Sequence, residues 1–271
     1  MKLKLWQVDA FATRVFAGNP AAVVPLDAWL PDATMQALAL ENNLSETAFF
    51  VPRGEGRYDL RWFTPLAEVP LCGHATLATA WVVLNELAPF LPSVSFQTKS
   101  GELSVARGEG GLLRMALPAD TNAPFPAPPG FADQMGRALG IIAPDEIHMG
   151  RYLFGVWKDA SVIRRIQLGD IAPVVNPTGK WGLIATAGGA SAAPYDFISR
   201  FFSVGHGIPE DPVTGSSHST LTPFWAKRLG KKTLRAHQAS PRGGDLLCTD
   251  EGDRVILSGA CAPYLRGEIY V

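Results

Sequence analysis

A single carboxylate, Glu46, enters an apolar stretch of the sequence. Leu44 precedes it, and Ala48, Phe49 and Phe50 follow it. Apolar surroundings make a carboxylate a stronger base, so that one group can take a proton from carbon and return it. The other interpretation is a solvated strand end, and this segment alone leaves both open.

His74 and Asp211 are the other side chains whose positions suggest chemistry. His74 follows Gly73 at the start of an apolar, helix-like segment, and an imidazole can exchange protons near neutral pH. Asp211 lies in a loop ahead of Gly215 and Ser216. Asp211 is interpreted either as a loop cap or as a second polar anchor for a ligand.

The sequence lacks the motifs of several other chemistries. Gly205-His206-Gly207 has no third glycine for a dinucleotide loop, and no P-loop occurs. Ser216, His218 and Asp211 lack the G-x-S-x-G context of a hydrolase triad. The five histidines have neither H-x-x-x-H nor H-E-x-x-H spacing. We therefore expect no metal and no cofactor.

Strands and helices with clear turn signals must position these residues. Gly18-Asn19-Pro20 predicts a turn between two antiparallel strands, and Pro31-Asp32 opens a short amphipathic helix that ends at Asn42-Asn43. The segment after Gly73 is apolar on nearly every face, which predicts a helix buried all round. Further strands are predicted at residues 44–51, 58–63, 94–97, 103–106 and 112–117.

The second half of the sequence repeats an order of motifs found in the first. The pattern arginine, aromatic, aromatic, hydroxyl occurs at residues 61–64 and again at 200–203. The pattern Pro-x-x-Gly follows each of them and ends at Gly73 and at Gly215. Two matches in the same order predict two similar halves, each with a helix after its glycine. Pro223 is expected to kink the second of these helices.

The repeat predicts the domain organisation and the ligand class. The halves are residues 1–118 and 130–261, joined by a proline-rich crossover, with residues 262–271 as a strand that returns to the first half. Each half presents a helix N-terminus, whose free N–H groups and partial positive charge favour an anion. We therefore expect a small carboxylate or enolate to bind at the interface between the helix ends.

Composition and charge exclude several partner classes. The chain has 24 Lys and Arg against 25 Asp and Glu, a net charge of −1, and 47% hydrophobic residues. This balance gives no reason to expect nucleic acid or an anionic membrane as a partner. Three widely spaced cysteines, and no secretion signal or membrane span, lead us to expect a cytoplasmic protein.

Five segments of the chain carry a joint signature. They are GNPAAVV at 18–24, NLSETAF at 43–49, RWFTP at 61–65, CGHAT at 72–76, and residues 207–216, which include DPVTGS. Together and in this order they resemble the phenazine-biosynthesis PhzF family of isomerases. The resemblance implies an α+β, diaminopimelate-epimerase-like fold: two pseudo-symmetric halves, each a curled, mostly antiparallel sheet around a central buried helix.

The resemblance also implies a reaction. Family members in phenazine biosynthesis isomerise trans-2,3-dihydro-3-hydroxyanthranilate by moving a hydrogen along its ring, without a cofactor. The implied catalytic residues are Glu46, which acts as the acid/base, and His74 and Asp211, which hold the polar groups of the substrate. The implied substrate-binding donors are Gly73, Gly215 and Ser216. Family members commonly form homodimers, and the sequence itself neither supports nor opposes that assembly.

Two other functions stay open. Racemases and epimerases of this fold use two cysteines, one from each half, and Cys72 offers the first of them. Thr214, Ser216 and Ser217 stand where the second thiol would be needed, which makes a two-thiol mechanism the less favoured one. A non-catalytic protein that binds a small ligand is the third interpretation, and an intact Glu46 argues against it.

Overall fold

The chain divides into two units in the computed structural model, which describes residues 1–204 and 209–271. Residues 1–117 and 256–271 form the first unit, and residues 118–255 form the second. The chain passes between the units within β8 (Leu113–Pro118) and β17 (Arg254–Gly259). His206 and Gly207, which the sequence analysis singled out, lie outside the described residues.

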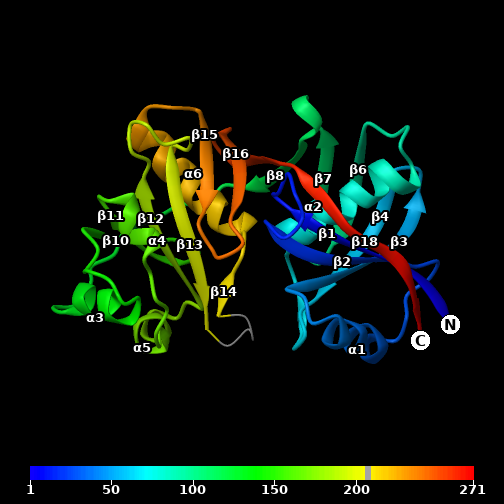
Figure 1. The fold of residues 1–271 in the computed structure, drawn as a ribbon, viewed down its shortest axis with the longest axis horizontal. Coiled ribbons are helices and arrows are strands. Elements are labelled where there is room, and N and C mark those ends of the chain that lie inside the picture. The colour runs from blue at the N-terminus through cyan, green and yellow to red at the C-terminus, as the bar shows by residue number, and fades with distance from the viewer. Residues whose placement is uncertain (205–208) are drawn as a thin grey trace. The chain divides into compact units, whose positions relative to one another are not determined.

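The first unit is a sheet with helices on both of its faces (Figure 1). Besides β8, its elements are β1 (Lys2–Ala10), β2 (Asn19–Pro25), α1 (Asp32–Asn42), β3 (Glu46–Gly54), β4 (Arg57–Phe63), β5 (Glu68–Val69), α2 (Gly73–Val82), a π-helical turn (Val83–Leu87), β6 (Ser93–Thr98), β7 (Gly101–Arg107), a short 3-10 turn (Glu109–Gly111) and β18 (Cys261–Tyr270).

Burial along β2 explains this layering. Six of its seven residues are buried, whereas a strand with one face in water alternates between buried and exposed. Ala22 and Val24 pack with Met35 of α1, and α2 contacts the same strand. Because successive side chains point to opposite faces, Ala21 and Val23 lie on the face away from α1.

The second unit is built in the same way (Figure 1). Besides β17, its elements are β9 (Ala123–Pro124), α3 (Phe131–Ala138), β10 (Glu146–Met149), β11 (Leu153–Trp157), α4 (Ala160–Arg164), α5 (Ala172–Val175), a 3-10 turn (Asn176–Thr178), β12 (Gly182–Gly188), β13 (Phe197–Ser203), β14 (Glu210–Asp211), α6 (Gly215–Leu229), β15 (Thr233–Gln238) and β16 (Gly244–Asp250).

Strand β12 shows the two covered faces of the second sheet. Leu183 and Ala185 pack in a cluster with residues of α3, α4 and α5. Thr186, which points the other way, accepts a hydrogen bond of 3.0 Å from Nε1 of Trp225 in α6. The small helices and the long helix α6 therefore cover opposite faces of this strand.

The internal topology of the two units is the same. In the first, β3 is parallel to β2 and antiparallel to β4, which is antiparallel to β5 and parallel to β6. In the second, β12 is parallel to β11 and antiparallel to β13, which is antiparallel to β14 and parallel to β15. The helix after β5 is α2, and the helix after β14 is α6. The predicted α+β class with two pseudo-symmetric halves is confirmed.

Pro223, at which the sequence predicts a kink, lies inside helix α6. The helix is assigned without a break from Gly215 to Leu229. Proline has no N–H, so the carbonyl of Ser219, four residues earlier, loses its helical donor. The backbone N–H of Asp120 donates to that carbonyl at 3.2 Å, which replaces the missing bond. A tertiary contact that the sequence does not reveal therefore satisfies this carbonyl.

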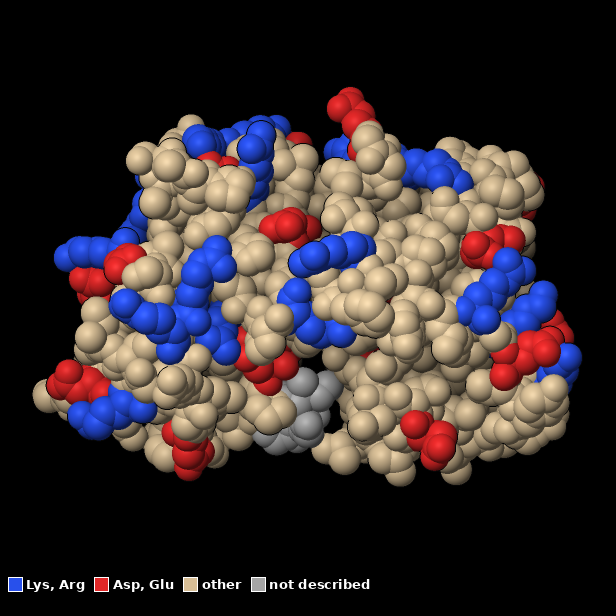
Figure 2. All heavy atoms as spheres, in the orientation of Figure 1, with Lys and Arg blue, Asp and Glu red and all other residues tan. Residues whose placement is uncertain are grey.

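Two general expectations can be compared with the structure. None of the helices among the described residues has the length and apolar character needed to cross a bilayer. Figure 2 shows basic and acidic side chains interspersed on the face it presents, as the near-zero net charge predicts.

Candidate active site

Glu46 and His74 lie in contact in the first unit. Glu46 is the first residue of β3, and His74 is the second residue of α2. His74 Nε2 lies 3.1 Å from Glu46 Oε2, and only 4% and 15% of the two side chains are exposed. A carboxylate and an imidazole so well shielded from water interact more strongly than the same pair on a surface.

The local sequence explains why Glu46 begins a strand. Helix α1 is closed by Asn43, whose backbone is left-handed (φ 48°), a conformation that asparagine tolerates better than most residues. Strand β3 then runs parallel to β2, with Glu46 in register with Ala21. Residues 47–50 are buried, so the strand enters the core directly after Glu46 and leaves the carboxylate at the boundary.

Two further side chains contact the other ring nitrogen of His74. Asn19 Nδ2 lies 3.0 Å from His74 Nδ1, and Cys72 Sγ lies 3.5 Å from the same atom. Asn19 is fully buried, and Cys72 is nearly so. The imidazole thus contacts a carboxylate through Nε2, and an amide and a thiol through Nδ1.

Glu46, Cys72 and His74 are also the types of side chain that bind transition metals. Their ligand atoms all lie within 4.8 Å of one another. However, the thiol contacts Nδ1 and the carboxylate contacts Nε2, on different edges of the ring. One ion could bind all three only if the imidazole turned, so the present orientation of the ring does not fit a metal site built from these three residues.

Asp211 belongs to a separate hydrogen-bonded group in the second unit. Its carboxylate accepts a hydrogen bond from the hydroxyl of Thr214. The side chain of Gln238, which is fully buried, accepts from Thr214 N at 2.9 Å and donates to the Asp211 carbonyl at 2.7 Å. One amide therefore fixes both ends of the loop that leads into α6.

Ser216 stands in the first turn of α6 and contacts a buried tyrosine. The hydroxyls of Ser216 and Tyr152 lie 2.7 Å apart. Burial raises the pKa of Tyr152 above its usual value, while the hydrogen bond with Ser216 opposes that shift. The phenol is therefore neutral at physiological pH and fixes the orientation of the Ser216 hydroxyl.

The N-termini of α2 and α6 share one property. Neither N-cap side chain, Cys72 in α2 and Thr214 in α6, accepts a hydrogen bond from its helix. The first N–H groups of a helix need partners from outside it, and an anion can provide them. Gly73 and Gly215 begin these two helices, as the sequence predicted.

His218 lies one helical turn into α6 and is fully buried. Its Nδ1 lies 2.8 Å from the Thr214 carbonyl, so the proton of the neutral ring is on Nδ1. Burial lowers the pKa of His218 to about 4. Among the described residues Nε2 has no hydrogen-bond partner. This histidine is therefore neutral at physiological pH.

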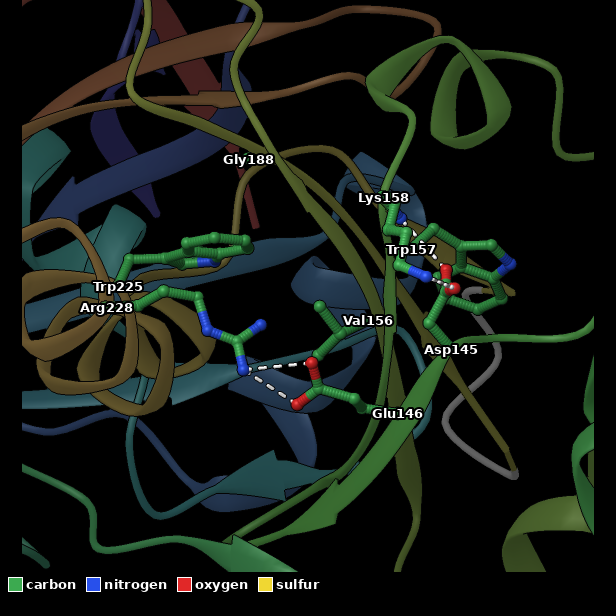
Figure 3. Close-up of a pocket in the computed structure, with 8 residues that line it drawn as sticks. All are labelled: Asp145, Glu146, Val156, Trp157, Lys158, Gly188, Trp225 and Arg228. Carbon is green, nitrogen blue, oxygen red and sulfur yellow. Dashed lines mark hydrogen bonds and ion pairs between the residues drawn. The ribbon is translucent and has the colours of Figure 1, made fainter.

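A cavity of about 210 Å³ in the second unit does not include any predicted site residue (Figure 3). Its charged side chains are paired with each other: Arg228 with Glu146 at 2.7 Å, and Lys158 with Asp145 at 3.0 Å. A ligand there would have to break these pairs, so the cavity gives no reason to place the function in it.

The structure places the predicted residues in two groups. Glu46, His74 and Gly73 belong to the first unit, and Asp211, Gly215 and Ser216 belong to the second. Sequence reasoning missed four residues that contact these groups, namely Asn19, Tyr152, Thr214 and Gln238. For Asn19 a signal existed, since it is an amide between a glycine and a proline at the start of an apolar run.

Comparisons with known proteins agree with this architecture. The model of a family described as "Phenazine biosynthesis-like protein" matches residues 8–267. An uncharacterized isomerase of Pseudomonas aeruginosa is 47% identical over 271 residues, with 100% of both chains covered. The crystal structure of a PhzF-family phenazine biosynthesis protein from Enterococcus faecalis has 43% identity and a TM-score of 0.90, again with 100% of both chains covered.

A more distant structure shares only the fold. A hydroxyproline epimerase from Agrobacterium vitis superposes with a TM-score of 0.59 at 10% identity, over 99% of this chain and 92% of that one. The epimerase-like fold expected from the sequence is thereby confirmed.

Proposed function

The chain belongs to the phenazine biosynthesis-like PhzC-PhzF family, and from this premise we propose that it is an isomerase that moves a proton on a small, carboxylate-bearing substrate. One observation carries the proposal, namely the shielded contact of 3.1 Å between Glu46 and His74 at the N-terminus of α2. The isomerase names of relatives that cover the whole chain support the same class.

Glu46 is the group that moves the proton. Its carboxylate takes a proton from a carbon next to an unsaturated system, and the electron pair of the broken C–H bond passes into that system as an enolate-like anion. The carboxylic acid then returns the proton to another carbon of the same molecule, so no oxidant, reductant or cofactor is consumed. A positioned acid/base typically contributes 10²–10⁴-fold to such a rate.

The remaining predicted residues bind the substrate and its anion. His74 and Asp211 interact with its polar groups. Gly73 and Gly215 offer backbone N–H groups at the starts of α2 and α6, and Ser216 offers a hydroxyl. Donors of this kind stabilise negative charge that develops during the reaction. Trans-2,3-dihydro-3-hydroxyanthranilate or a related molecule meets these requirements.

A second candidate function rests on a different contact. Cys72 Sγ lies 3.5 Å from His74 Nδ1, an arrangement in which an imidazole can take a proton from a thiol. The resulting thiolate would act as the base of an amino-acid racemase or epimerase. If Glu46 is the base, Glu46→Gln should lower the rate more than Cys72→Ser does. If Cys72 is the base, Cys72→Ser should lower it more.

The experiment follows deuterium from D₂O into trans-2,3-dihydro-3-hydroxyanthranilate and into a panel of α-amino acids and small cyclic acids by NMR. We expect isomerisation or exchange at a carbon next to an unsaturated system, and no effect of chelators or nucleotides. Glu46→Gln should lower the rate on the order of 10²-fold or more. Cys72→Ser should change it much less.

Controls separate chemistry from folding. Glu41→Gln makes the same chemical change at an exposed position of α1 and should keep the wild-type rate. A melting temperature of Glu46→Gln within about 2 °C of the wild type would assign the rate loss to chemistry rather than to folding. Loss of activity in Cys72→Ser but not in Glu46→Gln would favour the racemase. Binding without exchange by any panel member would favour a binding protein.

A further inference from the structure

We propose that Asn19 is a positioning residue that holds His74 as the neutral tautomer with its proton on Nε2, facing Glu46. This inference rests on the proposed function of Glu46 and assigns a role to the Gly-Asn-Pro segment. It starts from the contact of 3.0 Å between Asn19 Nδ2 and His74 Nδ1, which are both buried.

The donors and acceptors around the ring decide the tautomer. The NH₂ group of asparagine only donates, so Nδ1 must offer a lone pair, and the single proton of a neutral ring is then on Nε2. Nε2 lies 3.1 Å from Glu46 Oε2, a close contact that does not have hydrogen-bond geometry in this structure, and an ionised carboxylate only accepts. With this orientation both contacts join a donor to an acceptor.

The opposite orientation of the amide creates a conflict. If Oδ1 of Asn19 faced Nδ1, the proton would have to be on Nδ1, and a neutral ring would turn the lone pair of Nε2 toward Glu46. Two acceptors would then lie 3.1 Å apart. A doubly protonated ring would also avoid this conflict. The nearby Glu46 carboxylate favours that charge, whereas the positive end of α2, whose second residue is His74, opposes it, so the NMR measurement below has to distinguish the imidazolium from the neutral ring.

The backbone holds Asn19 firmly. Asn19 is the first residue of β2 and lies in register with Ala10 of β1. The preceding Gly18 has φ +65°, and a Cβ atom there would lie 2.1 Å from the Ala10 carbonyl oxygen. Gly18 therefore lets the two strands approach closely, and this approach places the Asn19 amide within reach of His74.

The consequence for the proposed reaction is a fixed base. The Nε2–H of His74 places a donor 3.1 Å from Glu46 Oε2 and so favours one orientation of the carboxylate. A wrong tautomer would present a lone pair to the carboxylate instead. In a serine protease an equivalent error of tautomer lowers kcat by about 10⁴-fold.

Asn19→Asp tests the role because it changes the chemistry and keeps the shape. An aspartate only accepts at neutral pH, so Nδ1 must then carry a proton. We expect kcat to fall at least about 10-fold while KM stays within about 3-fold, as befits a group that acts through the base. Asn85→Asp makes the same change at an exposed asparagine and should keep the wild-type kcat.

The second readout does not depend on activity. In ¹⁵N-histidine NMR spectra of the full chain, the His74 signals are those lost in His74→Asn. We expect the wild type to show the neutral ring with Nε2 protonated, and Asn19→Asp to show a proton on Nδ1. If Asn19→Asp does not fold, the wild-type spectrum decides alone.

Three results would overturn the proposal. They are a wild-type His74 with its proton on Nδ1, a wild-type imidazolium, and an Asn19→Asp protein with wild-type kcat. These results are distinct from a failure of the proposed function, which would show as an active Glu46→Gln protein whatever the tautomer of His74.

Discussion

Arg200 binds Glu210 through two parallel hydrogen bonds of 2.7 Å, from Nε to Oε1 and from Nη2 to Oε2. Arg61 and Glu68 form the same pair in the first unit, with both bonds at 2.8 Å. The Arg61–Glu68 pair joins β4 to β5, the two-residue strand before α2. The Arg200–Glu210 pair joins β13 to β14, the two-residue strand before α6. The repeat is therefore visible as a repeated interaction as well as a repeated topology.

The two pairs should differ in what they contribute to stability. Arg200 is nearly buried and also donates to the Ile166 carbonyl, whereas Arg61 keeps a second carboxylate, Asp32. Removal of one partner of a buried pair leaves an uncompensated charge, at a cost of about 3 kcal/mol or more. We expect Glu210→Gln to lose about 3 kcal/mol and Glu68→Gln about 1 kcal/mol in urea unfolding. Equal losses would show that Asp32 does not compensate.

His218 should make the protein sensitive to acid between pH 6.5 and pH 4. Its pKa is about 4 in the folded state because of burial, against an ordinary value of 6.5. In this window the unfolded chain binds a proton that the folded chain does not, so stability falls as pH falls. Between pH 6.5 and pH 5 the expected loss is about 2 kcal/mol.

His218→Gln is the variant that isolates this contribution, since glutamine does not titrate. Urea unfolding of both proteins from pH 4 to pH 7 gives the difference between their free energies of unfolding. The contributions of the titratable groups that the two proteins share cancel in this difference. The variant should lose about 2 kcal/mol less than the wild type between pH 6.5 and pH 5. Parallel curves would mean that His218 has the same pKa in both states.

Gly18 and Gly110 offer a matched pair of glycine variants. Both have a left-handed backbone, with φ +65° at Gly18 and +63° at Gly110. A Cβ atom at Gly18 would lie 2.1 Å from a carbonyl oxygen, whereas a Cβ atom at Gly110 would have no atom within 4 Å beyond those of its chain neighbours. Gly110→Ala should therefore lose only the backbone cost of about 1–2 kcal/mol. Gly18→Ala should lose several times as much in thermal or urea unfolding, and a similar loss in both would contradict the crowding.

Tyr152→Phe should weaken substrate binding without changing the base. The variant removes the hydroxyl that lies 2.7 Å from Ser216 Oγ, and Ser216 then loses its fixed orientation. One hydrogen bond contributes about 0.5–1.5 kcal/mol, so we expect KM to rise about 2–10-fold with kcat nearly unchanged. Tyr195→Phe, which removes a hydroxyl bonded to Arg164, is the control. A large fall in kcat would show that the phenol takes part in the reaction itself.

The sequence predicted the fold well because its signals are local and repeated. Alternating apolar residues and turn glycines marked most strands of the first unit, and the helix after Gly73 was recognised by its apolar faces. The hydrogen-bond partner of the Ser219 carbonyl, which Pro223 leaves without a helical donor, was not predictable, because this partner is the N–H of Asp120, about one hundred residues earlier.

The candidate site was predictable only in part. Side chains with reactive groups, such as Glu46 and His74, stand out in a sequence. Asn19 is marked by its Gly-Asn-Pro context and Gln238 by nothing local, but the role of either amide follows only from the atoms that surround it in the folded chain. Their partners lie 55 and 24 residues away, a separation that no local pattern encodes.

The pairing of β18 with β1 has a consequence for the order in which the protein forms. The two strands run antiparallel from Lys2 and Tyr270 to Ala10 and Cys261, and Val271 N donates to the Met1 carbonyl at 2.8 Å. During synthesis β1 leaves the ribosome early and waits for this partner until residues 118–255 have been made. The second unit is continuous, so residues 256–271, which are translated after it, complete the unit that residues 1–117 began. A circular permutant that links Met1 to Val271 would remove this delay.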